Sequence, residues 1–352
     1  MKLVHGGDWA GFEQEYGGLP LDFSANISPL GVPDGVRLAI AEAAAEADRY
    51  PDPLCRAVSA AIAASERCSA DFVLCGNGAA DLLFRLALAR RPRRALIPAP
   101  AFAEYAAALE TVDCAVERYV LREENGFLVD EGFLAAIRPG IDMVFLCEPN
   151  NPTGRTTPPA LLRRVLDRCG EVGALLVVDE CFSDFLDDPE AHTLTGQLAG
   201  HSGLLILKAF TKLYAMAGVR LGYCLCADGA LLDAMRCSGQ PWAVSTLAQA
   251  AGIAALKETD YVARVRALIQ RERPFLAEGL KTLGLRVIPG EANYLLFRSG
   301  RPLVEPLRRR GILLRSCGNY PGLDESWYRT AVRTRTENER LLTALGEVLH
   351  DG

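Results

Sequence analysis

Lys212 is the residue of this sequence with the clearest capacity for covalent chemistry. A lysine amine forms a Schiff base with an aldehyde, provided that its surroundings hold it unprotonated for part of the time. Thr211 beside it offers a hydroxyl, and Arg220, eight residues further on, offers a fork of donors that suits phosphate. These residues could together hold a phosphorylated aldehyde, or they could form a solvated basic turn before a strand, because short motifs give many false positives.

Three other side chains suit a flat ring with a protonated nitrogen. Asp179 ends an apolar run, where a carboxylate needs a partner such as that nitrogen, and its charge would keep the ring an electron sink. Asn151 could donate to a hydroxyl of the ring, and Phe102 could stack on its face. Each has an ordinary alternative: a helix N-cap or a buried ion pair for Asp179, a closed Asn-Pro turn for Asn151, and a core position for Phe102.

A glycine turn at residues 76–79 follows a predicted strand and precedes a predicted helix. Free backbone N–H groups and the helix dipole at such a junction attract anions. The pattern predicts an anion site here, although similar turns also occur without a ligand.

Apolar runs alternate with helical patterns along most of the chain. This alternation predicts an α/β fold with a mostly parallel, seven-stranded sheet covered by helices on both faces. Ligands of such sheets bind at the carboxyl ends of the strands. Asn77, Asn151, Asp179 and the Lys212 loop follow strand ends, so we expect them to meet. The predicted strands span residues 71–75, 95–98, 117–121, 142–147, 174–180, 204–207 and 220–226.

The composition is ordinary for a soluble globular enzyme: of 352 residues, half are hydrophobic and 23% are charged. The net charge of −6 gives no sign of binding to nucleic acid, and no apolar run is long enough to span a membrane. The 11 cysteines form no C-x-x-C pair and lack neighbouring metal ligands, so no metal site is expected. Their odd number and the lack of a secretory signal predict reduced thiols in the cytoplasm.

Three stretches, taken in this order, resemble the fold-type I pyridoxal-phosphate (PLP) enzymes, the aspartate aminotransferase superfamily. They are Asn-Asn-Pro-Thr-Gly at residues 150–154, Val-Val-Asp-Glu at residues 177–180, and Thr-Lys with an arginine eight residues later. The resemblance covers about residues 5–345. It implies pyridoxal 5'-phosphate as the cofactor, with Lys212 as the lysine that forms the Schiff base and Asp179 as the partner of the pyridine nitrogen.

The same resemblance implies roles for further residues. Asn151 matches the residue at the ring hydroxyl, and Phe102 matches the aromatic residue that stacks on the ring. Lys208 lies in the strand before the loop. The spacing from Thr211 and Arg220, two of the residues implied to hold the phosphate, matches the family pattern for Lys212 and not for Lys208. The residues implied to hold the cofactor phosphate are Gly78, Ala79, Thr211 and Arg220.

Two aromatic positions affect what the resemblance implies. Tyr50, within Tyr-Pro-Asp-Pro, matches a tyrosine that reaches the cofactor phosphate of the neighbouring subunit, which implies a homodimer. Three residues after Asp179, aminotransferases usually have a tyrosine that also bonds the ring hydroxyl. This sequence has Phe182 there, so Asn151 would act alone.

Within the superfamily, the sequence is most similar to the threonine-phosphate decarboxylase branch, and next to histidinol-phosphate aminotransferase. The His5-Gly-Gly start, Phe182 and Arg333 resemble the decarboxylases, whereas Ser245 and Ala217 depart from residues common among them. The implied function is decarboxylation of an O-phospho-amino acid in cobalamin biosynthesis, with L-threonine O-3-phosphate giving aminopropanol phosphate, or with serine phosphate as a related substrate. The alternatives are an aminotransferase of the histidinol-phosphate type and a catalytically silent binding protein on the same fold.

A substrate with both a phosphate and a carboxylate needs several guanidinium donors. Arg315, Arg329 and Arg333 fall near the ends of predicted strands, and the resemblance implies that Arg329 handles the substrate carboxylate. We expect His5 and Asn26 to join these arginines in binding the substrate. Because the chain has 33 arginines, Arg333 could equally be a surface charge.

The chain is expected to have three parts. Residues 34–240 would form the large PLP-binding domain, and residues 241–352 a small α+β domain. Residues 1–33 would form an arm that packs on the small domain and the active site, because glycines argue against a long regular element there. The arm could be a plain surface loop, or a lid that brings His5 and Asn26 to a pocket.

Overall fold

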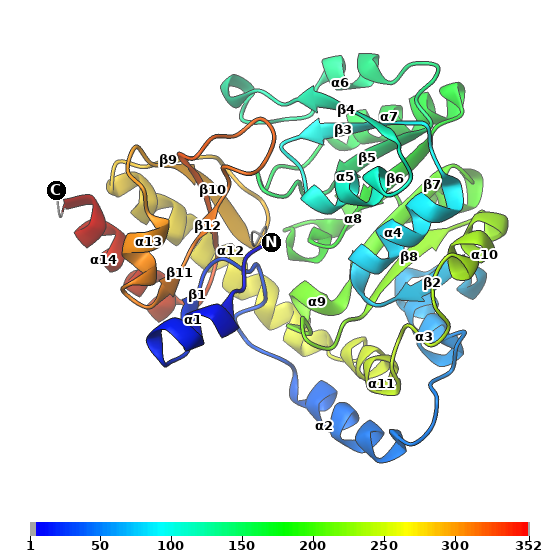
Figure 1. The fold of residues 1–352 in the computed structure, drawn as a ribbon, viewed down its shortest axis with the longest axis horizontal. Helices are drawn as coiled ribbons and strands as arrows, with labels where there is room; N and C mark the ends of the chain where they lie inside the picture. Colours follow the sequence, from blue (N-terminus) through cyan, green and yellow to red (C-terminus); the bar gives the residue numbers. More distant parts are fainter. Residues whose placement is uncertain (1–4, 351–352) are drawn as a thin grey trace.

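The structure is a computed structural model that describes residues 5–350. Figure 1 shows a larger lobe built on a central sheet and a smaller lobe formed mainly by the C-terminal part of the chain. The N-terminal arm packs against the smaller lobe, because its strand β1 (Leu21–Asp22) pairs in parallel with β11 (Ile312–Leu313).

The large lobe contains a seven-stranded sheet in the order β2-β8-β7-β6-β5-β3-β4. Strand β8 is antiparallel to both of its neighbours, and the other neighbouring pairs are parallel. The predicted fold class is therefore confirmed. The strands are β2 (Val73–Gly76), β3 (Arg94–Ala99), β4 (Ala115–Val120), β5 (Met143–Cys147), β6 (Leu175–Asp179), β7 (Leu204–Ala209) and β8 (Gly222–Cys226).

Strand β5 shows why the central strands are apolar throughout. Val144 and Leu146 belong to the core on one face of the sheet, whereas Met143 and Phe145 belong to the core on the other face. Successive side chains of a strand point to opposite faces, so a strand covered on both faces must be apolar at every position. The edge strand β4 is instead partly exposed along its length.

Helices cover both faces of this sheet (Figure 1). Several of them begin directly after a strand, which places their N-termini at the carboxyl edge of the sheet. The helices of the large lobe are α2 (Asp34–Ala43), α3 (Arg56–Glu66), α4 (Gly78–Arg90), α5 (Ala103–Glu110), α6 (Glu131–Ala136), α7 (Pro159–Val172), α8 (Pro189–His192), α9 (Phe210–Leu213), α10 (Gly229–Cys237) and α11 (Thr246–Ala255).

The small lobe has a four-stranded antiparallel sheet in the order β12-β13-β10-β9, with its own hydrophobic core. Its elements are α12 (Thr259–Thr282), β9 (Arg286–Val287), β10 (Tyr294–Arg298), α13 (Val304–Arg308), β12 (Arg315–Ser316), β13 (Trp327–Ala331) and α14 (Arg335–His350). The sequence predicts one helical region over residues 246–283, but the structure has two helices there. Helix α11 buries Ala251 in the large-lobe core and α12 buries Val265 in the small-lobe core, so the chain must turn between them.

The arm contains one regular helix that its glycines did not suggest, α1 (Trp9–Tyr16). The Asp8 side chain accepts a hydrogen bond from the N–H of Gly11 at 3.2 Å, which caps the start of the helix. Gly17, with φ at +73°, ends the helix in the left-handed region that favours glycine. Beyond the helix, Phe23 is fully buried in the small-lobe core.

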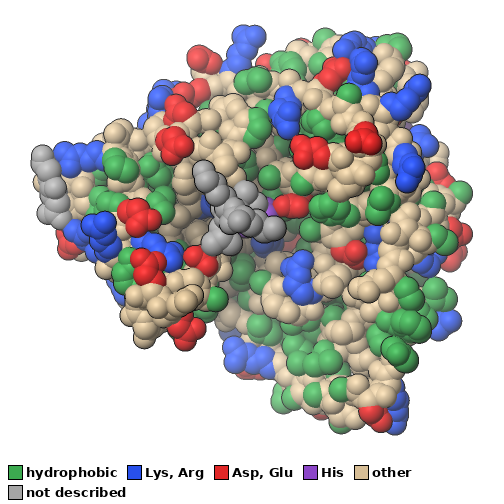
Figure 2. Space-filling view, viewed as in Figure 1, with side chains coloured by type: hydrophobic (Ala, Val, Ile, Leu, Met, Phe, Trp, Pro, Cys, Tyr) green, Lys and Arg blue, Asp and Glu red, His purple; other side chains and the backbone are tan. Residues whose placement is uncertain are grey.

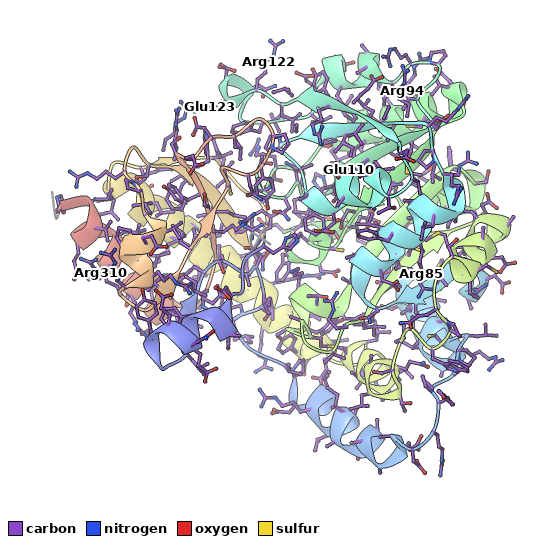
Figure 3. All side chains as sticks on the ribbon, in the orientation of Figure 1. Arg85, Arg94, Glu110, Arg122, Glu123 and Arg310 are labelled. Carbon is purple, nitrogen blue, oxygen red and sulfur yellow. The ribbon has the colours of Figure 1, made fainter. Side chains whose placement is uncertain are left out.

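Charged side chains of both signs are interspersed over the face shown in Figure 2, without a large patch of one sign. Figure 3 labels Glu123 in the large lobe. Its carboxylate pairs with two arginines of the small lobe, Arg286 at 2.8 Å and Arg298 at 3.5 Å. Within the described residues, no helix has both the length and the apolar character needed to cross a membrane.

Candidate active site

A cavity of about 440 Å³ lies at the carboxyl edge of the large sheet, where the two lobes and the arm meet. The arm, the strand ends of the large lobe and the antiparallel sheet of the small lobe all contribute to its wall. The residues of the sequence prediction that line it are His5, Asn26, Ala79, Phe102, Asn151, Asp179, Thr211, Lys212, Arg220, Arg315 and Arg329. No group of three or more potential metal ligands occurs among the described residues.

Lys212 lies on the short helix α9, directly after strand β7. Burial lowers the pKa of its amine to about 8, and the positive charges of Arg329 and Arg220 act in the same direction. The amine lies 5.7 Å from the centre of the Phe182 ring, which offers it no hydrogen-bond acceptor. The Lys212 amine is therefore neutral far more often near pH 7 than the amine of an ordinary lysine, and the neutral form is the one that attacks an aldehyde.

Lys208 has the opposite environment. Its amine pairs with Glu66 at 2.8 Å, and Glu66 also accepts a hydrogen bond from the hydroxyl of Tyr223 at 2.5 Å. Burial alone would lower the pKa of Lys208, but the surrounding carboxylates, including Asp184 and Glu66, raise it above its ordinary value. Lys208 is thus held as a cation outside the cavity, which leaves Lys212 as the lysine suited to a Schiff base.

Asp179 ends strand β6 with its carboxylate held in place by two donors. The backbone N–H of Cys181 donates to one oxygen at 3.0 Å, and the hydroxyl of Tyr105 donates to the other at 2.6 Å. Tyr105 is 0% exposed and stacks on Phe145 with ring centres 5.1 Å apart. The sequence prediction missed Tyr105; the available signal was its position three residues after Phe102, on the helix next to the strand ends, where a buried hydroxyl needs a partner.

Arg329 and Asn151 join the two lobes at the cavity. A terminal nitrogen of Arg329 donates to the side-chain oxygen of Asn151 at 2.5 Å, and the other donates to the carbonyl of Ser24 at 2.8 Å. The oxygen of Asn151 is thereby engaged, so its NH₂ group is left to donate to a ligand. Arg329 is only 6% exposed, and no carboxylate of the described residues pairs with it. A buried guanidinium without an anion is costly, which favours an anionic ligand beside it.

The N-terminus of helix α4 forms another part of the cavity wall, through Ala79. Arg220 donates to the carbonyl of Asn77 at 3.3 Å and lies so close to Gly78 that a Cβ there would be 2.5 Å from its guanidinium. A Cβ on Gly222 would likewise be 2.6 Å from the backbone nitrogen of Ala79. The two glycines thus allow an arginine, a strand and a helix N-terminus to converge, an arrangement that suits a phosphate.

The arm contributes two polar side chains to the cavity. Asn26 is 2% exposed, and neither its side-chain nitrogen nor its oxygen has a partner in the described part of the chain. The Nε2 atom of His5 lies 2.7 Å from the carboxylate of Glu104 on helix α5. Glu104 also lines the cavity, and the sequence gave no reason to select it.

Three residues of the sequence prediction do not line the cavity. Gly78 lies behind Arg220, as described above. Arg333 donates to the carbonyl of Asp22 at 3.2 Å and pairs with Glu337 at 2.7 Å, so its charge is used within the small lobe and the arm. Tyr50 is 80% exposed and stacks on Trp242, with ring centres 4.5 Å apart.

The chain matches known proteins over almost its whole length. The family model described as aminotransferase class I and II matches residues 20–345. The threonine-phosphate decarboxylase of Salmonella typhimurium is 40% identical over 333 residues, 94% of this chain and 91% of that protein. The histidinol-phosphate aminotransferase of Symbiobacterium thermophilum is 35% identical over 335 residues, 93% of this chain and 90% of that protein. The crystal structure of the histidinol-phosphate aminotransferase from Clostridium acetobutylicum has a TM-score of 0.88 and 30% identity, and the match covers 94% of this chain and 99% of that chain.

These matches define the class of protein: the chain belongs to the class I and II aminotransferase family of fold-type I enzymes. Its cofactor is pyridoxal 5'-phosphate, as the sequence predicted. The two relatives are named for different reactions, a decarboxylation and an amino transfer.

Proposed function

We propose that this protein is a PLP-dependent decarboxylase of an O-phospho-amino acid, with L-threonine O-3-phosphate as its substrate and aminopropanol phosphate as its product. The observation that supports this most is the buried Arg329, which has no carboxylate partner among residues 5–350 and shares one cavity with Arg315 and Lys212. These cations match a substrate with two anionic groups. The 40% identity to a threonine-phosphate decarboxylase supports the same substrate and a place in cobalamin biosynthesis.

The cavity has the groups that this cofactor needs. Lys212 would hold the aldehyde carbon, Asp179 the ring nitrogen, Asn151 the ring oxygen, and Phe102 one face of the ring. Ala79, Thr211 and Arg220 would hold the cofactor phosphate, and Gly78 would leave room for the guanidinium of Arg220. When bound, pyridoxal phosphate supplies an electron sink for the bond that breaks next to the substrate nitrogen.

The chain's own residues would determine which bond breaks. The broken bond is the one perpendicular to the ring, so a decarboxylase must turn the substrate carboxylate out of the ring plane. Arg329 and Arg315 approach from the small lobe, and they would hold the carboxylate and the phosphate in that orientation, with His5 and Asn26 on the arm side. Since Arg333 is ion-paired outside the cavity, we assign it no direct contact. Lys212 would then return a proton to the carbon that has lost carbon dioxide.

The test is to incubate the holoenzyme with L-threonine phosphate and to measure carbon dioxide and keto acid separately. We expect carbon dioxide, and much slower turnover of phosphate-free threonine, because the remote phosphate would help to hold the reacting geometry. Borohydride reduction should fix the cofactor on Lys212, and label on Lys208 would contradict the assignment. A catalytically silent protein would show neither product, although the lowered pKa of Lys212 speaks against it.

The second candidate is an aminotransferase of the histidinol-phosphate type. It is supported by the 35% identity to such an enzyme and by the structural match to another. Transfer of an amino group from histidinol phosphate to a keto acid, without release of carbon dioxide from threonine or serine phosphate, would establish this reaction in place of decarboxylation.

We further propose a homodimer in which Tyr50 reaches the cofactor phosphate of the neighbouring subunit. Tyr50, Trp242, Leu38 and Leu54 are all large and exposed in the single chain, and Figure 2 shows hydrophobic side chains gathered over α3 and α11. Such a patch is typical of a protein interface. Tyr50→Phe should weaken retention of pyridoxal phosphate without unfolding the chain, and sedimentation should show a dimer; a fully active monomer would exclude this arrangement.

A further inference from the structure

Within the described residues, two carboxylates line the cavity, Asp179 and Glu104. Asp179 has its task at the ring nitrogen. Glu104, the second residue of helix α5, has no task in the scheme above. A carboxylate in a cavity that takes an anionic substrate repels that substrate unless a cation compensates for it.

The group that faces Glu104 is His5. Its Nε2 atom lies 2.7 Å from Glu104, with side-chain exposures of 49% for His5 and 18% for Glu104. An ionised carboxylate can only accept hydrogen bonds, so Nε2 must carry the proton. This fixes the role of the other ring nitrogen, Nδ1, which makes no hydrogen bond to the described part of the chain and is left for a ligand. The His5 ring centre is 5.9 Å from that of Phe102, the residue proposed to stack on the cofactor.

The backbone next to His5 packs against Ser24 of the arm. A Cβ on Gly6 would lie 2.3 Å from the carbonyl oxygen of Ser24, so only glycine fits there. The N–H of Gly7 donates to the Ser24 hydroxyl at 2.8 Å, and the carbonyl of Ser24 accepts from Arg329 at 2.8 Å. His5 thus lies between Glu104 of the large lobe and the contact that Ser24 of the arm makes with Arg329 of the small lobe.

We infer that Glu104 is a positioning residue that fixes the orientation and tautomer of His5, so that Nδ1 binds the phosphate of the substrate. This inference rests on the proposed use of a phosphorylated substrate. A neutral imidazole accepts a hydrogen bond at Nδ1 from a phosphate monoanion, and an imidazolium donates one to a dianion. In both cases one proton lies between His5 and the phosphate, and Glu104 holds the opposite side of the ring. A substrate without phosphate gains nothing from this pair.

The experiment compares holoenzyme variants Glu104→Gln, Glu104→Asp, His5→Ala and the double variant His5→Ala/Glu104→Gln. Glu110→Gln is the matched control, because Glu110 is an exposed carboxylate at the other end of the same helix (Figure 3). KM and kcat are measured with L-threonine phosphate and with L-threonine, and binding is followed separately by the change in the cofactor spectrum.

We expect Glu104→Gln to raise KM for the phosphorylated substrate by roughly tenfold, since the contact is partly exposed, and to leave kcat within about threefold. KM for L-threonine should stay unchanged, and Glu104→Asp should restore part of the loss. In the His5→Ala background, Glu104→Gln should have no additional effect, because Glu104 acts through His5. Glu110→Gln should behave as the unaltered enzyme.

Equal effects on both substrates, or a further loss in the His5→Ala background, would show that Glu104 does not act through a His5–phosphate contact, and the inference would be wrong. It would also be wrong if the unaltered enzyme bound phosphorylated and unphosphorylated compounds equally well. If keto acid forms in place of carbon dioxide, the proposed reaction fails alone. Histidinol phosphate and histidinol then serve as the substrate pair, and the same comparison decides the role of Glu104.

Discussion

Lys212 should capture pyridoxal phosphate at a rate that rises with pH and levels off above about pH 8. Its pKa is about 8, because of burial and of the nearby Arg329 and Arg220. Only the neutral amine attacks the aldehyde. At pH 7 the neutral fraction is about 9% for a pKa of about 8, and about 0.04% for an ordinary lysine, so the environment of Lys212 should accelerate capture by roughly 200-fold.

Arg329→Gln tests the cause of this shift. Arg329 is the strongest charged contributor to the lowered pKa of Lys212, after burial. The substitution removes its positive charge and keeps a donor near Asn151, so the midpoint of the pH profile should move to higher pH. Each pH unit of that movement should slow capture at pH 7 by about tenfold.

The assay mixes cofactor-free protein with pyridoxal phosphate from about pH 6 to about pH 10 and follows the yellow colour by stopped flow. Lys212→Ala is the control that should develop no colour at this site. A capture rate that keeps rising to about pH 10, or one that does not depend on pH, would refute the reasoning. So would an unchanged midpoint in Arg329→Gln, since the charge of Arg329 would then have no influence on Lys212.

Three further substitutions test other parts of the protein. Tyr105→Phe removes the 2.6 Å hydrogen bond to Asp179. It should lower the free energy of unfolding, measured in urea, by about 1.5–3 kcal/mol and weaken cofactor binding. An unchanged free energy of unfolding together with unchanged cofactor binding would contradict this prediction. Arg329→Ala removes the donors to Asn151 and to the substrate and should cost on the order of 2–4 kcal/mol in kcat/KM for threonine phosphate, whereas a change below about twofold would count against the assigned contact. Burial raises the pKa of Glu148 from 4.5 to about 8. Between these two pH values the folded protein keeps a proton that the unfolded chain has released, so the free energy of unfolding should fall as the pH rises from about 4.5 to about 8. Glu148→Gln removes this pH dependence of stability. The melting temperature of the variant minus that of the unaltered protein should therefore increase from about pH 5 to about pH 9. A difference in melting temperature that stays constant over this range would rule out Glu148 as the source of the pH dependence.

Sequence reasoning works well for the large sheet because its central strands are buried on both faces. Strand β5 (Met143–Cys147), for example, appears as an unbroken apolar run with the polar Glu148 directly after it. The carboxyl ends of parallel strands lie on the same edge, so strand order need not be known to predict that Asn151, Asp179 and Lys212 meet. The structure places all three in the wall of one cavity.

Contacts that depend on tertiary structure are harder to predict. Tyr105 stands in an apolar helix and resembles any core aromatic; only the packing of α5 on the sheet shows that its hydroxyl meets Asp179. Glu104, its neighbour, resembles an ordinary charge of a first helical turn. The sequence left open whether Arg333 binds the substrate or is a surface charge. In the structure β13 ends at Ala331, and Arg333 pairs with Glu337, four residues further on.

The charges of the cavity also indicate how Lys212 would serve two steps, the attack on the cofactor aldehyde and the later return of a proton to the substrate carbon. Arg329 and Arg220 lower the pKa of Lys212 only while their positive charges are not offset. The proposed ligands, a carboxylate beside Arg329 and a phosphate beside Arg220, bring the opposite charge to each arginine. We therefore expect the Lys212 amine to be neutral more often, and so readier to attack, when the cavity holds no anion, and to become more basic once both anions are bound. A more basic amine holds a proton better, which is what the later return of a proton to the substrate carbon requires. The same arginines would thus select an anionic substrate and adjust the lysine to each stage of the reaction.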